Sequence, residues 1–74
     1  MDTKEIRDLQ RQRADAINKI ARIKKRRAEV LAKRVRDEAR RRRFVRRLDQ
    51  EISRAEDIRA IAEANLTGLG VDIE

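Results

Sequence analysis

The chain contains no cysteine, histidine, proline, tryptophan or tyrosine among its 74 residues. The absence of cysteine excludes disulfide bonds, thiol nucleophiles and thiolate metal sites. The absence of histidine removes the side chain that most often acts as a general base or binds transition metals near neutral pH. The sequence therefore predicts no metal site and no cofactor.

Catalytic motifs are missing as well. No glycine-rich phosphate loop and no nucleophile motif occurs in the sequence. The two acidic pairs, Asp37-Glu38 and Glu56-Asp57, are sequence neighbours, so the members of a pair do not share one face of a helix and cannot act as a carboxylate dyad. We predict that the protein is not an enzyme.

Large apolar side chains are scarce, with a single Phe as the only aromatic residue, while 47% of the residues are charged. Such a chain has little with which to build a core, so a second copy or a partner protein is expected to complete it. No stretch approaches the ~20 apolar residues that a membrane-spanning helix needs, so no membrane association is expected. A cytoplasmic location, including association with a nucleoid, is the expectation.

Helix is predicted from Thr3 to about Thr67, because good helix formers dominate this range and it contains neither glycine nor proline. Asp2 or Thr3 is suited to the N-cap. Gly68 is suited to the left-handed position that follows a helix C-terminus. The fold class is therefore all-α.

The first apolar stripe follows an eleven-residue repeat. Its members are Ile6, Leu9, Ile17, Ile20, Ala28, Leu31, Val35 and Ala39. An eleven-residue repeat advances by about 3.67 residues per turn and keeps one stripe on a nearly straight helix. A heptad register fits less well, because it places arginines at successive core positions.

A second apolar stripe begins at Phe44 or Val45 and is rotated by roughly a third of a turn from the first. It continues through Leu48, Ile52, Ala55, Ile58, Ala62 and Leu66. Either one rod serves two partners, or the helix breaks within residues 40–49. We favour the break, with Asp49 as the cap of the second helix.

The resulting prediction is a single domain over residues 1–74. It comprises a long basic helix (3–47), a shorter acidic helix (49–67) and a C-terminal tail (68–74), arranged as a helical hairpin or a bent coiled coil and completed by a dimer or a partner. The predicted oligomeric contact consists of Ile6, Leu9, Ile17, Ile20, Leu31, Val35, Leu48 and Ile52.

Positive charge is concentrated between Lys19 and Arg47. This 29-residue block holds fifteen basic and three acidic residues, a balance of +12, whereas the whole chain carries +7. Residues 48–74 hold seven acids and two arginines. That acidic segment either neutralises the basic helix by lying antiparallel to it or serves as a separate docking segment.

On a continuous helix, the basic residues between Arg22 and Arg47 would form a ridge about 37 Å long. One turn of B-DNA spans about 34 to 36 Å, and arginine, which supplies most of the charge, binds phosphate bidentately. The residues predicted to bind nucleic acid are Arg22, Lys25, Arg26, Arg27, Lys33, Arg36, Arg40, Arg41, Arg42, Arg43, Arg46 and Arg47.

The leading hypothesis is a non-enzymatic, dimeric protein that binds duplex DNA through phosphate in an architectural or regulatory role. The alternative is a protein-interaction module (a scaffold, virion component or inhibitor) that docks its basic face on an acidic protein surface. RNA and an anionic membrane rank lower, since one Phe supplies neither stacking platforms nor membrane anchors.

Overall fold

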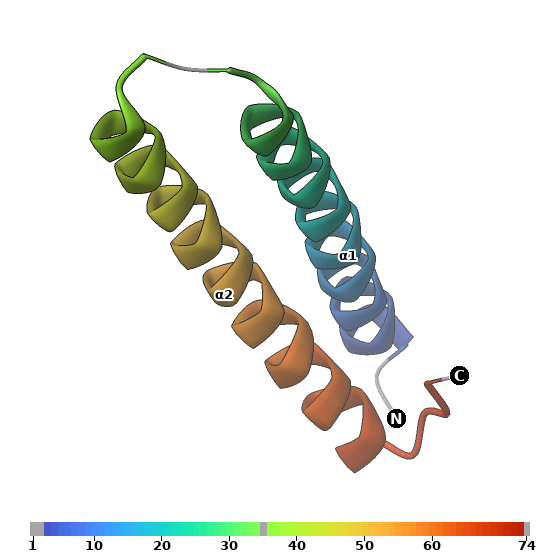
Figure 1. The fold of residues 1–74 in the computed structure, drawn as a ribbon. Helices are drawn as coiled ribbons and strands as arrows, with labels where there is room; N and C mark the ends of the chain where they lie inside the picture. Colours follow the sequence, from blue (N-terminus) through green and yellow to red (C-terminus); the bar gives the residue numbers. More distant parts are fainter. Residues whose placement is uncertain (1–2, 35, 74) are drawn as a thin grey trace.

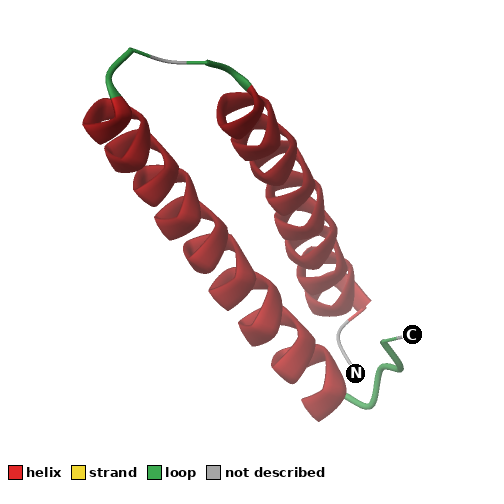
Figure 2. Cartoon of the chain, in the orientation of Figure 1, coloured by secondary structure: helices red, strands yellow, loops and turns green. Residues whose placement is uncertain are grey.

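The computed structural model, which describes residues 3–34 and 36–73, is a hairpin of two antiparallel α-helices (Figure 1). Helix α1 spans Thr3–Ala32 and helix α2 spans Glu38–Gly68. No strand occurs in the described ranges (Figure 2). The rod measures 56 × 18 × 14 Å, and both chain ends lie at the end opposite the turn. The all-α prediction is confirmed, and of the arrangements considered it is the helical hairpin that forms.

The turn between the helices lies earlier than predicted. Residues 33–37 connect the helices, so the prediction of one helix over 3–47 and a second over 49–67 is wrong. Asp37, not Asp49, is the N-cap of α2, and its Oδ1 accepts a hydrogen bond of 3.1 Å from the backbone N–H of Arg40. Asp49 lies inside α2 and binds Arg27 of α1.

Packing explains the position of this turn. Two helices of 30 and 31 residues cover each other along their whole length. A turn near residue 48 would leave a second helix of about half that length, too short to reach the N-terminal part of the first. The early turn therefore buries more of the first apolar stripe within one chain.

The core lies along the line where the helices meet. Its buried residues are Leu9, Ala16, Ile20 and Ile23 from α1 and Leu48, Ile52, Ala55, Ala62 and Leu66 from α2. The alanines keep the two backbones close, and half-buried Phe44 packs on the cluster around Ile20 and Leu48. Helix α2 thus covers what a second chain was expected to cover at these positions.

The C-terminus of α2 closes with a glycine, although not the predicted one. Gly68 is still helical, and Gly70 adopts the left-handed conformation with φ +80°. The backbone N–H of Val71 then donates to the carbonyl oxygen of Leu66 at 3.0 Å. This hydrogen bond turns the tail back, and Val71 and Ile73 become half-buried.

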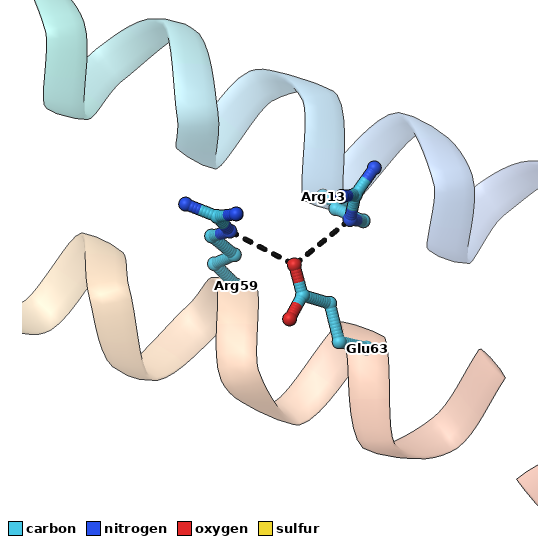
Figure 3. A network of polar contacts seen from close by, with 3 residues as sticks. All are labelled: Arg13, Arg59 and Glu63. Carbon is cyan, nitrogen blue, oxygen red and sulfur yellow. Dashed lines mark hydrogen bonds and ion pairs between the residues drawn. The ribbon is translucent and has the colours of Figure 1, made fainter. Parts of the chain in front are cut away.

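A three-residue network joins the two helices near their free ends (Figure 3). Oε1 of Glu63 accepts hydrogen bonds from Nε of Arg59 at 2.8 Å and from Nε of Arg13, on α1, at 2.9 Å. These two hydrogen bonds, that of Arg59 first, lower the pKa of the Glu63 carboxyl below its ordinary value of 4.5. The carboxylate therefore stabilises the hairpin while it is ionised.

Glu63→Gln should make the stability of the hairpin less dependent on pH. The lowered pKa means that the stabilisation is present above the unfolded pKa of 4.5 and is lost as the pH falls through the folded value. Thermal unfolding followed by circular dichroism should show a Tm difference between wild type and variant near pH 7 that shrinks towards about pH 3. Glu56→Gln, at an exposed acid on the same helix, is the control. A difference that is constant over this range would contradict the assignment.

Candidate nucleic-acid interface

The turn folds the basic block of residues 19–47 back on itself. Its first part lies in the C-terminal half of α1, its last part lies in the N-terminal third of α2, and the two run side by side at the end away from both termini (Figure 1). This block carries +12, whereas the rest of the chain carries −5. The rod therefore has a basic end at the turn and a neutral to acidic end at the termini.

The structure distributes the predicted binding residues over three segments. Arg22, Lys25, Arg26 and Arg27 lie on α1, Lys33 and Arg36 lie in the turn, and Arg40, Arg41, Arg42, Arg43, Arg46 and Arg47 lie on α2. The predicted straight ridge of about 37 Å does not form, because the turn interrupts it after Ala32. A basic end made of two short antiparallel segments replaces it.

Most side chains of this basic end are not neutralised by the protein. Arg27 binds Asp49 at 2.7 Å and Arg41 binds Glu38 at 2.8 Å, and these are the two half-buried members of the block. The guanidinium of Arg26 lies over the Phe44 ring, 5.3 Å from its centroid.

The other twelve basic side chains are exposed and make no ion pair within residues 3–34 and 36–73. They are Lys19, Arg22, Lys24, Lys25, Lys33, Arg34, Arg36, Arg40, Arg42, Arg43, Arg46 and Arg47. Three of them, Lys19, Lys24 and Arg34, were not predicted to bind. Arg34 and Lys24 fall near the apolar stripe on a projected continuous helix, and for Arg34 the turn removes that constraint.

A cleft of about 570 Å³ opens between the helices beside the turn. Its charged lining consists of Arg34, Arg36, Asp37, Arg40 and Arg41, and its apolar lining consists of Val30 and Phe44. Four guanidinium groups thus border one space around an apolar floor. Phosphate or carboxylate groups are the ligands that such a set of donors recognises.

The arginines of α2 work against the stability of the free protein. Arg40 and Arg41 lie in the first turn of the helix, where the macrodipole favours acids. Arg43 and Arg47 are four residues apart and repel each other on one face. Because these charges raise the free energy of the folded chain, an anion that binds them relieves a repulsion that the fold leaves in place.

The residues predicted for an oligomeric contact fall into three groups. Leu9, Ile20, Leu48 and Ile52 are buried within the chain. Ile6 and Ile17 are half-buried, and Leu31 is 43% exposed. Val35 lies outside the described residues.

Comparison with protein-family models, with curated proteins and with solved structures finds no match. Neither α1 nor α2 is apolar enough over a sufficient length to cross a bilayer. Within residues 3–34 and 36–73, no three acidic side chains are grouped so that they could hold a metal ion.

Proposed function

We propose that the protein binds double-stranded DNA through the phosphate backbone, with the basic end of the hairpin as the contact surface. The single observation that supports this most strongly is the collection of twelve exposed cations without carboxylate partners on both sides of one turn. A polyanion of regular charge spacing neutralises many of them at once and releases its own counterions. The role is architectural or regulatory, not enzymatic.

The dimensions of the hairpin favour contacts with phosphates over contacts with bases. The major groove is about 12 Å wide and admits one helix, whereas the paired helices measure 18 × 14 Å across. The basic end therefore lies over the phosphates that border a groove. Phosphate contacts carry no sequence information of their own, so sequence preference should be weak.

Docking on an acidic protein is the second candidate, and the cleft is the observation in its favour. Duplex phosphates need cations only, whereas Val30 and Phe44 provide an apolar floor between the arginines. An acidic peptide with one apolar side chain would use both parts of this cleft. Duplex DNA remains the leading proposal because most of the unpaired cations lie outside the cleft.

Affinity for a duplex of about 20 base pairs should fall steeply with salt concentration. If the basic end neutralises about five to eight phosphates, a plot of log K against log salt should have a slope of about −4.5 to −7. Fluorescence anisotropy over a salt series measures this slope, and duplexes of two unrelated sequences test for sequence preference. Salt-insensitive binding, or no binding at low salt, would refute the proposal and favour the acidic protein partner.

A further inference from the structure

Helix α1 carries apolar residues that α2 does not cover. We call them the α1 flank: Ile6, Ala14, Ile17, Ala21, Ala28 and Leu31. At 100° per residue they lie about a quarter of a turn from the buried line through Leu9 and Ile20. Ile6 and Ile17 are half-buried, and the other four are exposed. From Ile6 to Leu31 the flank is about 37 Å long, as long as a helix–helix seam.

The opposite face of the hairpin does not offer a comparable surface. It is marked by shallow grooves lined by residues such as Lys19, Glu51 and Ile58. Ile58 and Ile61, 49% and 62% exposed, are the large apolar residues on this side of α2. They occupy one turn of the helix and are followed towards the turn by charged Arg54 and Glu51.

The charge distribution identifies what covers the α1 flank. A parallel partner of the same kind would place two ends of +12 side by side, whereas an antiparallel copy places each basic end beside the neutral to acidic end of the other. We propose that a second copy of this chain packs antiparallel against the α1 flank, so that the two α1 helices form the central contact.

The spacing of the flank indicates the register of this pair. If the two α1 helices cross near Lys19, Leu31 of one copy lies level with Ile6 and Arg7 of the other. Ile17 then lies level with Ala21 of the other copy. The largest flank residues thus meet apolar side chains, and the smaller alanines allow close approach of the backbones.

The same register also matches charged residues beside the seam. Within one hairpin, Arg13 is level with Glu63 and Arg27 is level with Asp49. The antiparallel pair therefore brings Glu63 level with Lys25 of the second copy and Asp49 level with Arg11 of the second copy. Both acids lie on the side of α2 that faces the α1 flank, so each dimer contains two copies of each opposite-charge pairing.

Such a dimer has a basic end at each extremity. If each end binds duplex DNA as proposed above, one dimer can join two duplexes or two distant stretches of one duplex. This consequence rests on the proposed DNA binding, whereas the pairing of the chains does not. The test of the pairing therefore uses the protein alone, treated with nuclease and kept at high salt.

Sedimentation equilibrium should give about twice the chain mass of 8.7 kDa. Ala21→Glu places a charge in the centre of the seam at a residue that is exposed in the hairpin, so it should give a monomer with unchanged helicity by circular dichroism. Ile61→Glu, on the other face, should leave the dimer intact. A monomeric wild type, a dimer that survives Ala21→Glu, or a dimer that only Ile61→Glu dissociates would overturn the proposal.

Engineered cysteines test the direction of the pair, because the natural chain has none. Gln10 and Ala28 are both exposed and should be level with each other across the antiparallel seam. Mixing chains that carry Gln10→Cys with chains that carry Ala28→Cys should give the mixed disulfide on oxidation, since the Cα atoms must approach within about 7 Å. Cross-linking of Ala28→Cys with itself, and not with Gln10→Cys, would show a parallel pair and refute the proposed arrangement.

Discussion

Replacing Arg43 and Arg47 together with glutamate should lower the affinity for a 20-base-pair duplex by about 100-fold or more, because two hydrogen bonds between charged groups, each worth about 1.5–3 kcal/mol, are lost. Both side chains are exposed, lie on the basic end and make no ion pair in the described part of the chain. Helicity should not change, since neither residue touches the core. Anisotropy at low salt measures the loss, and circular dichroism checks the fold.

The matched control changes the same charge elsewhere. Arg7→Glu combined with Arg54→Glu also replaces two exposed arginines, and both pairs of changes lower the net charge from +7 to +3. These arginines lie outside the basic block, so we expect a loss of less than about tenfold, from the weaker long-range attraction alone. Equal losses in the two double variants would show that total charge, and not the basic end, controls binding.

The second large effect concerns the core. Leu48→Ala should unfold much of the hairpin, because removing a buried leucine side chain costs about 2–5 kcal/mol and small single-core chains have a total stability of about 3–5 kcal/mol. Leu48 is 3% exposed and belongs to the central cluster with Ile20 and Ile23. Far-ultraviolet circular dichroism should show lower helicity at room temperature and a midpoint shifted to lower urea concentration.

Ile61→Ala is the control for this experiment. Ile61 is 62% exposed, so its truncation should change the free energy of unfolding by no more than about 0.5 kcal/mol. If both variants unfold at the same urea concentration, the packing of α1 on α2 around Leu48 does not hold the hairpin together.

Helix content and the residues that face the core were predictable from local sequence. The absence of proline and the late position of both glycines allow helix throughout. The eleven-residue repeat correctly predicted burial at Leu9 and Ile20, and the second stripe did so at Leu48, Ile52 and Leu66. These predictions succeed because helical periodicity depends on neighbours three and four residues away.

The position of the turn was not predictable in the same way. Residues 33–37 contain no glycine or proline, and the apolar repeat continues through them, so local preferences favour an unbroken helix. The available signal was Asp37, a good N-cap residue followed by Glu38 in the first turn of the helix. Asp49 has the same features, and local chemistry could not distinguish the two.

The sequence by itself determined that the chain is helical and that positive charge is concentrated in residues 19–47, because both properties depend on composition and short-range order. Only the tertiary structure decided that this charge forms a basic end on two antiparallel segments and not one long ridge. The physical reason is that a turn in the middle lets two helices of nearly equal length bury each other's apolar faces along the whole rod, which a later turn cannot do.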